Sequence, residues 1–464
     1  MIPVALRPLG GSLIRIKLSE TGPDSAWCLT PAQGRRLARS GVVRAVPSPY
    51  ESGSWLVGPG RKVGAARVGD VEVRITPKVT IGRLLFLAGY AQHGAAWQLE
   101  DVPLPEEAGL VPVMAQILWR QVERATRQGL LSGYVVTEET AYVLRGRLRE
   151  TDQLHRHHGL PIPLEIRHDD FTADIPENQI LRAACERMLH VPGVDAASML
   201  MLRRLLRDFA DVSPLDRRDV VPAWQPTRLN ARYHLALRVA ELVLRAASAE
   251  QGSGDVAVNG FLLDMPRLFE DFVTVALRQA LVTAYGGRVD DQDPHQFDEA
   301  GQVRVLPDIV WKLRGTPVAV ADAKYKAEKP TGYPNADLYQ LLAYCTVLGL
   351  RSGHLIYAKG GEQPAHHVVQ RSGIEILCHA VDLDVEPTAL MDQMRALARR
   401  IADTARRPRS YRPPRGGAEP PGCRPGGAAS GGLRARKADP DFSPAPALPA
   451  LPLTRCWNFP TLGL

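Results

Sequence analysis

Two aspartates and a lysine stand at the ends of two short apolar stretches in the C-terminal half of the chain. Asp308 precedes the apolar residues 309–311, and Asp322 and Lys324 end the run that begins at Val318. Charged groups at the ends of buried strands are costly unless they are paired, bind a metal or take part in catalysis. The pattern therefore predicts a functional site built from these three side chains.

The two stretches predict a β-hairpin with a turn at residues 314–316. A turn of that length sets Leu313 opposite Pro317, which is tolerated as the first residue of its strand. Counting along the strands from that pair sets Asp308 opposite Asp322. Directly opposed residues have Cβ atoms about 4.5–5.5 Å apart, so the two carboxylates should lie close together.

Two carboxylates held this close repel each other, and one is protonated unless a cation lies between them. Mg²⁺ is suited to that position because it takes carboxylate oxygens and keeps several waters. We therefore predict Mg²⁺ on Asp308 and Asp322, with the carbonyl of Ala323 as a further ligand. Lys324 shares the face of Asp322 and could position or deprotonate an attacking water, while the metal stabilises charge on a phosphate.

Side chains from two neighbouring predicted helices point to the same site. Asp337, Gln340 and Tyr344 follow helical spacing along one face of the helix after the hairpin. We predict a catalytic role for Gln340 and substrate contacts for Tyr344 and for Lys326, just past the hairpin. Glu270, in the early turns of the preceding helix, is predicted as a third metal ligand.

Each residue also has a structural explanation when it is taken alone. Asp308 and Asp322 could cap strand ends, and Lys324 could form a surface ion pair that contributes under about 1 kcal/mol. Glu270 could be a solvated acid beside a helix N-terminus. The combination of Pro-Asp, a hairpin-length gap, Asp-x-Lys and then Gln-x-x-x-Tyr on the next helix favours the functional interpretation.

Helices and strands must position these residues. Their predicted pattern indicates an α/β chain of the α+β multidomain type. Residues 1–100 indicate a β-rich domain that is a candidate for binding a partner, and residues 101–254 indicate a helical region. Residues 255–405 predict a unit with a mixed sheet flanked by helices, in the order helix, strand, strand, helix, strand. Residues 406–464 are rich in Arg, Pro and Gly without periodicity and should be disordered.

Individual elements follow from periodicity and end signals. Residues 155–158 contain three histidines, and we expect them in a solvated loop and not on a metal. Residues 141–148 predict a strand or a passage from strand to loop. The other predicted strands are at residues 12–18, 71–75, 354–358, 366–369 and 373–378. The predicted helices are at residues 31–37, 84–92, 111–127, 177–189, 197–209, 231–247, 265–285, 335–348 and 387–401.

Composition indicates a cytoplasmic protein. The 464 residues are 45% hydrophobic and 23% charged, with no signal-like start and no apolar run long enough to span a bilayer. The six scattered cysteines form no Cys-x-x-Cys pair, which argues against a zinc ribbon or an iron–sulfur cluster. Ten basic and three acidic residues follow Ala405 and account for the whole net charge of +7. The tail could help to hold polyanions or could simply keep the chain in solution.

Several short stretches resemble known nucleases. Residues 307–308 with residues 322–324 resemble the core motif of the PD-(D/E)xK nuclease superfamily, and residues 340–344 resemble the glutamine motif of its RecB-like branch. More narrowly, the chain resembles the McrC family, the nuclease subunits of McrBC 5-methylcytosine restriction systems. The supporting stretches are Ile75-Thr76-Pro77-Lys78, Leu144-Arg145-Gly146-Arg147, Asp174 with residues 177–181, Leu268-Phe269-Glu270, residues 322–326 and Asp337-Leu338-Tyr339-Gln340.

The resemblance implies a Mg²⁺-dependent endonuclease for modified double-stranded DNA that works with a GTP-hydrolysing AAA+ ring, the McrB-like partner. In that family the ring reads the DNA, and the nuclease subunit binds the ring through its N-terminal part. The sequence contains no Gly-x-x-x-x-Gly-Lys-Ser/Thr, so we expect no nucleotide hydrolysis through a P-loop of its own.

Two alternatives remain: a stand-alone RecB-like repair nuclease, and a non-catalytic scaffold that activates an AAA+ ring. The scattered cysteines argue against the iron–sulfur members of the RecB-like branch. The intact set of two acids and a lysine argues against the scaffold.

Overall fold

The computed structural model describes residues 13–97, 109–158, 160–216, 220–248, 258–325, 335–358 and 365–406. The chain divides into two compact units, Met1–Arg407 and Pro408–Leu464, and every described residue belongs to the first. Lys326 and the predicted tail beyond Arg406 lie outside the described residues. None of the helices in the described ranges is long and apolar enough to cross a membrane.

The N-terminal part is β-rich, as its alternating pattern predicts. Its strands form two sheets, in the orders β1-β6-β5-β10 and β2-β4-β3. Helix α1 (Pro31–Ser40) begins with a capping box, in which the Thr30 side chain accepts from the Gln33 N–H and the Gln33 side chain accepts from the Thr30 N–H. The strands are β1 (Ile14–Ser19), β2 (Ser25–Cys28), β3 (Val43–Pro47), β4 (Ser54–Pro59), β5 (Lys62–Val68) and β6 (Val71–Thr76).

One strand of the first sheet comes from much later in the chain. β10 (Val258–Asp264) pairs antiparallel with β5 along its whole length. A Cβ on Gly64 would lie 2.1 Å from the Phe261 carbonyl oxygen, and Gly64 has a φ of +124°, so this close approach requires glycine. The sequence pattern grouped these residues with the C-terminal unit, but they complete the N-terminal sheet instead.

A group of helices occupies most of the middle of the chain, as predicted. α5 packs on both α6 and α7, and α3 packs on the same two helices. The predicted helix at residues 231–247 starts with a 3-10 turn before it becomes α-helical. The helices are α2 (Ile81–His93), η1 (Gly94–Ala96), α3 (Leu110–Thr126), α5 (Pro176–Leu189), α6 (Ala196–Asp208), η2 (Ala231–Tyr233) and α7 (His234–Ser248).

This middle region also contains a small sheet that the helical prediction missed. β7 (Gly133–Ala141), β9 (Leu164–Thr172) and β8 (Arg147–Leu148) pair in the order β7-β9-β8. β7 has no buried residue and β9 buries two of its nine, Glu165 and Ile166, so neither strand has the alternating buried apolar face that makes a strand visible in a sequence. Residues 141–148 are the passage out of β7 into a loop and β8.

His155 and His157 are helical and not in the expected loop, because α4 (Glu150–His157) connects β8 to β9, and His158 directly follows the helix. His157 Nε2 lies 2.9 Å from Glu165 Oε1 on β9. Glu165 is buried, and it also accepts a hydrogen bond from Thr140 Oγ1 at 2.9 Å and pairs with Arg156 at 3.2 Å. His157 therefore contacts a carboxylate of the small sheet.

The C-terminal part is a mixed sheet flanked by helices, as predicted. Its strand order is β11-β14-β15-β16-β18-β17, with β15, β16 and β18 parallel and the other pairs antiparallel. The strands are β11 (Arg288–Asp291), β14 (Ile309–Leu313), β15 (Thr316–Lys324), β16 (Ser352–Ala358), β17 (Ala365–Val368) and β18 (Glu375–Val381), with a small hairpin of β12 (His295–Gln296) and β13 (Arg304–Val305). The helices are α8 (Met265–Tyr285), α9 (Asn335–Leu348) and α10 (Pro387–Ala405).

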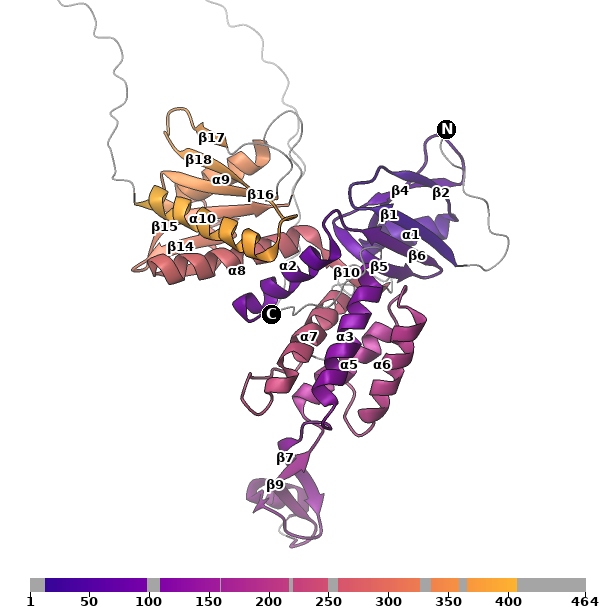
Figure 1. Ribbon diagram of the computed structural model, residues 1–464. Helices are drawn as coiled ribbons and strands as arrows, with labels where there is room; N and C mark the ends of the chain where they lie inside the picture. Colours follow the sequence, from indigo (N-terminus) through magenta and orange to yellow (C-terminus); the bar gives the residue numbers. More distant parts are fainter. Residues whose placement is uncertain are drawn as a thin grey trace, which may run out of the picture. The chain divides into compact units, whose positions relative to one another are not determined.

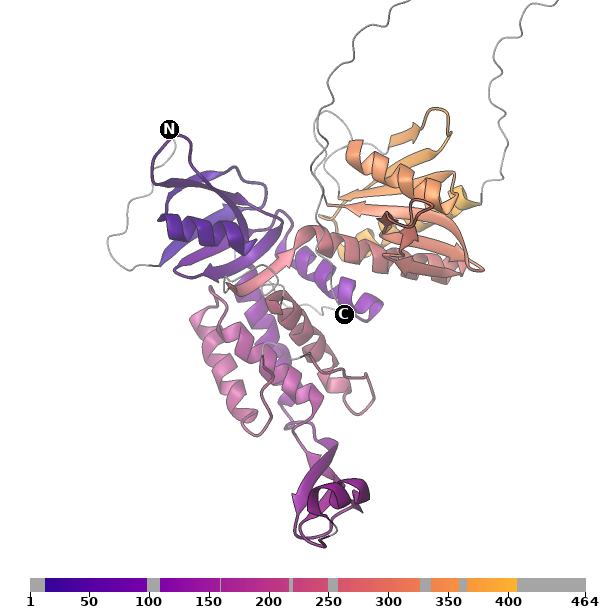
Figure 2. The same ribbon diagram turned by 180° about the vertical axis from the view of Figure 1, so that it is seen from behind.

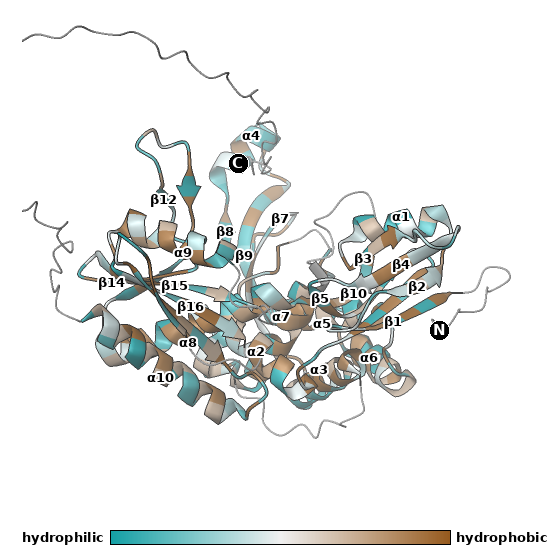
Figure 3. Cartoon of the chain, turned by 90° about the horizontal axis from the view of Figure 1, so that it is seen from above, coloured by the Kyte–Doolittle hydropathy of each residue, from teal (hydrophilic) through white to brown (hydrophobic). Residues whose placement is uncertain are grey.

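The helices cover both faces of this sheet. α8 and α10 lie across the face seen in Figure 1, and α9, in orange, lies across the face seen from behind in Figure 2. Hydrophobic residues gather on β15 and β16, whereas α10 alternates between hydrophobic and hydrophilic (Figure 3). Val310 and Val320 pack with α9, and Trp311 and Ala321 pack with the opposite core. Since side chains alternate along a strand, the face that holds α9 also holds Asp322.

Candidate active site at the β14–β15 hairpin

The hairpin turn is one residue shorter than the sequence predicts. Leu313 pairs with Thr316 and not with Pro317. Arg314 and Gly315 alone form the turn, both with positive φ, at 50° and 81°. This is the backbone of a two-residue type I′ turn, whose twist matches that of the two strands.

A bulge compensates for the shorter turn before the strands reach the acidic residues. The register shifts at the extra residue, Val318, so that Ile309 pairs with Ala321. Asp308 directly precedes Ile309, and Asp322 directly follows Ala321. The two aspartates therefore stand opposite each other, as predicted. The pairing at the turn was wrong, but the bulge restores the expected register.

The two aspartates are buried at the end of the hairpin. Asp322 is 0% exposed and Asp308 is 9% exposed. Asp308 Oδ2 accepts a hydrogen bond from the Ala323 N–H at 3.0 Å, and Lys324 Nζ lies 2.6 Å from Asp322 Oδ2. Apart from that ion pair, neither carboxylate oxygen of Asp322 has a hydrogen-bond partner among the described residues.

Burial opposes ionisation of both aspartates, and the charge of Asp322 also opposes ionisation of Asp308. Burial, followed by the charges of Asp322 and Glu270, raises the pKa of Asp308 to about 8. Burial also raises the pKa of Asp322, although Lys324 acts to lower it. Burial alone would lower the pKa of Lys324, but the charge of Asp322 and its contact with that carboxylate outweigh burial and raise it. The lysine therefore stays protonated beside the aspartates.

Helix α9 brings Gln340 and Tyr344 to the same face of the sheet. Tyr344 is buried, and its hydroxyl donates to the Leu306 carbonyl oxygen at 3.2 Å while accepting from Gln340 Nε2 at 2.6 Å. Burial and the charge of Asp322 raise the pKa of Tyr344 to about 12, so the hydroxyl keeps its proton. Gln340 is exposed, which leaves its carbonyl oxygen open to solvent on the predicted face.

Two further side chains belong to this cluster: Asp337, which the sequence set on the face of Gln340, and Tyr357, which the sequence did not indicate. Asp337 on α9 is 3% exposed, and its charge raises the pKa values of both Asp322 and Lys324. The Tyr357 hydroxyl donates to Asp337 Oδ2 at 3.4 Å, and Tyr357 pairs with Lys324 in the parallel register of β15 and β16. Helical spacing already set Asp337 on the face of Gln340, whereas nothing local in the sequence indicates Tyr357.

Glu270 is not gathered with the two aspartates. Its carboxylate accepts a hydrogen bond from Gln292 Nε2 at 3.0 Å, and it acts on Asp308 through its charge. Within the described ranges, no group of three or more His, Cys, Asp or Glu side chains is arranged to bind a metal. The site therefore offers two converging carboxylates, with Glu270 nearby on α8.

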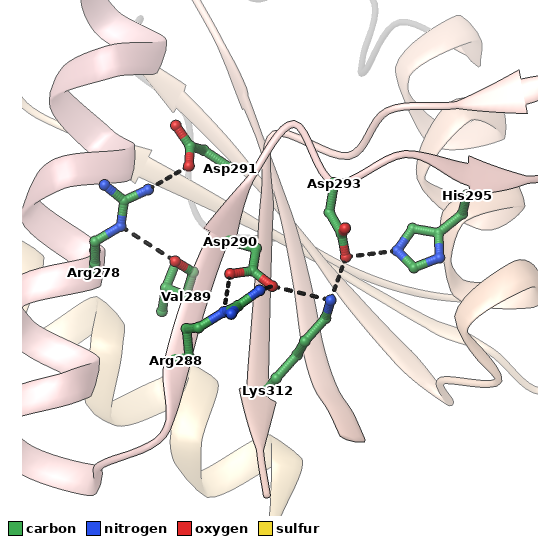
Figure 4. A network of polar contacts seen from close by, with 8 residues as sticks. All are labelled: Arg278, Arg288, Val289, Asp290, Asp291, Asp293, His295 and Lys312. Atoms are coloured by element: carbon green, nitrogen blue, oxygen red, sulfur yellow. Dashed lines mark hydrogen bonds and ion pairs between the residues drawn. The ribbon is translucent and has the colours of Figure 1, made fainter. Parts of the chain in front are cut away.

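A polar network holds the edge of the sheet next to the site (Figure 4). Lys312 Nζ on β14 lies 3.0 Å from Asp290 Oδ2 on β11 and 2.5 Å from Asp293 Oδ2. Asp293 also contacts His295 at 2.8 Å, and Arg278 of α8 pairs with Asp291 at 2.7 Å. These contacts fix β11 and β14 to each other and to α8, which positions the strand that follows Asp308.

The residues present fit a hard divalent cation. Two buried carboxylates face each other, and the oxygens of Asp322 have only the lysine as a partner. A cation between them would remove the repulsion and use the free oxygen lone pairs, as oxygen-rich Mg²⁺ sites do. Asp308 and Asp322 are the residues that would hold it.

Comparison with protein families and curated proteins gives one match. A family model described as a McrBC 5-methylcytosine restriction system component matches residues 58–358. No curated protein matches the chain.

The solved structures that match include two from Thermococcus gammatolerans. The first is to a chain in a refined half-complex from a tetradecameric assembly of McrB AAA+ hexamers with bound McrC. It has 18% identity and a TM-score of 0.52, and covers 83% of this chain and 100% of that chain. The second is to the McrBC complex, with 20% identity, a TM-score of 0.35, and coverage of 57% and 88% respectively. The first match shows a shared fold.

Proposed function

Because this chain belongs to the family of McrBC 5-methylcytosine restriction system components, we propose that it is the Mg²⁺-dependent DNA endonuclease subunit of such a system. The proposal includes a PD-(D/E)xK nuclease fold for the C-terminal sheet and a cytoplasmic location. The observation that supports it most directly is the buried pair Asp308 and Asp322 with Lys324 against it, at the ends of two neighbouring strands.

Asp308 and Asp322 would hold Mg²⁺ at the end of the hairpin. When bound there, Mg²⁺ supplies charge neutralisation for a scissile phosphate and lowers the pKa of a water ligand. The Asp308 carboxylate is already oriented by the Ala323 N–H, so one of its oxygens is fixed before any ligand binds. The strand geometry thus pre-arranges both acids for the reaction.

Lys324 supplies the positive charge of the chain itself. Its ammonium lies 2.6 Å from Asp322 Oδ2 and is protonated, so it can donate to an attacking water or to a phosphate oxygen. Gln340 can orient the same water through its carbonyl oxygen, because Tyr344 fixes the amide end of that side chain. Tyr344 keeps its proton and acts as a hydrogen-bonding support.

The proposed partner is a GTP-hydrolysing AAA+ ring that reads the modified DNA. This part of the proposal is supported by the family match and by the similar fold in an assembly of McrB AAA+ hexamers with bound McrC. The absence of a P-loop motif in the sequence agrees with a division of labour in which the ring hydrolyses nucleotide and this chain cuts.

A plasmid cleavage assay tests the proposal. The full chain is incubated with methylated or unmethylated plasmid, with or without the AAA+ partner, GTP and Mg²⁺. We expect cleavage only of the methylated plasmid, and only when all three additions are present. Cleavage without the partner would indicate a stand-alone nuclease. Partner activation without any cleavage would indicate a scaffold, and either result would overturn the proposal.

A further inference from the structure

A second charged feature lies on the helical part of the chain, away from the hairpin in the fold. A cavity of about 450 Å³ opens between α3 and α7, which lie side by side in Figure 1. Four arginines line it: Arg124, Arg127, Arg232 and Arg238. No aspartate or glutamate is among the described residues that line the cavity.

The helical periodicity of the sequence explains how these charges meet. Gln121, Arg124 and Gln128 are spaced three and four residues apart on α3 and its C-terminal end, so they share one face. His234 and Arg238 are four residues apart on α7 and share a face in the same way. Packing of α3 against α7 brings the two faces together.

Two of the guanidinium groups are held in place by uncharged acceptors. Arg232 donates to Gln128 Oε1 at 3.2 Å and to the Gly129 carbonyl oxygen at 3.0 Å. Arg238 donates to the carbonyl oxygen of Ala96. Such contacts orient a guanidinium without neutralising it, and they leave its remaining N–H groups for a ligand.

One acid acts on the cavity from outside its lining. Burial lowers the pKa of Arg238, and the charge of Glu241 acts in the opposite direction. Glu241 accepts a hydrogen bond from Trp224 Nε1 at 3.0 Å, so its carboxylate is already engaged. The lining itself keeps an excess of positive charge.

The lining selects among classes of ligand. It has four guanidinium groups, two amides and an imidazole, but only alanines and Leu235 as apolar residues and no Phe, Tyr or Trp ring. A base or nucleoside would need a ring or apolar wall to stack on, and a protein anchor would need an apolar pocket. Arginine forks match phosphate oxygens in geometry and charge.

We propose that this cavity binds phosphate groups of the DNA backbone, at a site separate from the hairpin that cuts. The inference rests on the proposed function for the identity of the ligand as DNA. Phosphate contacts hold a duplex in register but carry no sequence information. The site therefore holds DNA irrespective of its modification.

Salt dependence of DNA binding tests the site. The full chain is titrated onto a fluorescently labelled 30-base-pair duplex in EDTA, between 50 and 200 mM salt, by fluorescence anisotropy. The test variant is Arg124→Gln/Arg127→Gln, two exposed arginines of α3 and its C-terminal end. The matched control is Arg203→Gln/Arg204→Gln, two exposed arginines of α6 that do not line the cavity. Melting temperatures check that both variants fold.

We expect the test variant to bind roughly tenfold more weakly at 50 mM salt, with a slope of log K against log salt shallower by about 1 to 2. The loss should be equal on methylated and unmethylated duplexes, and the control should match the native chain. Equal losses in test and control variants, or no loss in the test variant, would overturn the proposal. So would a loss confined to binding of the AAA+ partner, because the cavity would then hold a protein surface.

The same assay separates this inference from the endonuclease proposal. Binding in EDTA is independent of cleavage, so it is unaffected if the hairpin proves inactive. If the cavity variant alone loses salt-dependent binding while the chain never cuts, the phosphate site stands and the endonuclease role falls. If cleavage occurs but the cavity variant binds DNA normally, the endonuclease role stands and the phosphate site falls.

Discussion

At the scale of single residues, Asp308 and Asp322 are a source of instability in the chain without a cation. Both are buried, they face each other, and only Lys324 supplies a compensating charge. Burial of a carboxylate favours its protonated form and so links folding to pH. The arrangement of the two carboxylates that is proposed to bind a cation therefore also lowers the stability of the chain when no cation is bound.

That cost predicts a pH dependence of unfolding. The pKa of Asp308 is raised to about 8 in the folded chain, against about 3.9 when unfolded. The folded chain then holds a proton that the unfolded chain releases, so stability is full below about pH 4 and is lost progressively as the pH rises to about 8. From pH 5 to 8.5 in EDTA, the unfolding free energy of the native chain should fall by on the order of a few kcal/mol more than that of Asp308→Asn. Urea unfolding measures both.

Mg²⁺ should cancel the slope of unfolding free energy against pH in the native chain, because a cation neutralises the pair. The same addition should leave the unfolding free energy of Asp308→Asn unchanged. Glu299→Gln, an exposed acid between β12 and β13, is the control and should keep the slope of the native chain. A native chain whose unfolding free energy has the same pH dependence as that of Asp308→Asn would contradict the electrostatic account of the pair.

The sequence was sufficient to predict the three charged residues of the hairpin, because a strand and a turn depend on residues that are close together in the chain. Asp308, Asp322 and Lys324 are linked by alternation and by a hairpin count that a bulge happens to restore. Tyr357 could not be predicted in the same way, because its position beside Lys324 depends on a parallel pairing across a whole helical crossover. Which residues meet across such a crossover is decided by packing and not by local spacing.

At the scale of elements, the packing of α9 on β16 decides whether the site is assembled. A Cβ at Gly353 would lie 2.7 Å from Cys345 Sγ and 2.8 Å from Leu341 Cγ, both on α9. Glycine therefore allows α9 to approach the sheet closely enough for Gln340 and Tyr344 to reach the hairpin.

Gly353→Ala should destabilise the chain by about 1–3 kcal/mol, because the added methyl group overpacks this contact. Urea unfolding followed by circular dichroism measures the loss. Adding Cys345→Ala in the same chain removes the nearest atom and should restore part of the stability. Full stability in the single variant would show that α9 is not packed as closely as described.

Element prediction succeeded where ends and periodicity were strong. The bounds of α8 and α9 agree with the sequence prediction because proline and glycine mark their ends and an apolar face marks their bodies. The strands β7 and β9 were missed because they are mostly exposed and lack a buried face. The residues of β10 were grouped with the C-terminal unit because the partner strand β5 lies almost 200 residues earlier in the chain.

At the scale of the whole molecule, the N-terminal part contacts the residue that follows β15. Lys78, in the segment that follows β6, places its Nζ 4.3 Å from the centre of the Tyr325 ring. Tyr325 directly follows Lys324, and burial together with the charge of Glu20 raises its pKa. The Lys78 N–H donates to Glu20 Oε2 at 2.8 Å, which fixes the segment.

This contact predicts a measurable coupling between the two parts. Lys78→Ala should cost about 0.5–1 kcal/mol in unfolding free energy, as a cation–π contact of an exposed lysine does. The double variant with Tyr325→Leu should lose less than the sum of the single losses, because the contact can be lost only once. Lys17→Ala, an exposed lysine on β1, should change stability by less than about 0.5 kcal/mol. Strict additivity of Lys78 and Tyr325 would contradict the contact.

The central claim is that the hairpin is the centre that cuts DNA, and its most direct test is the cleavage rate of matched variants. Asp308→Asn, Lys324→Met and Glu299→Gln are compared with the native chain on methylated plasmid, with partner, GTP and Mg²⁺ in excess. We predict at least a hundredfold loss for Asp308→Asn and Lys324→Met, since each removes charge stabilisation at the reacting phosphate, and native rates for Glu299→Gln, an exposed acid between β12 and β13. Cleavage by Asp308→Asn and Lys324→Met at the native rate would contradict the account.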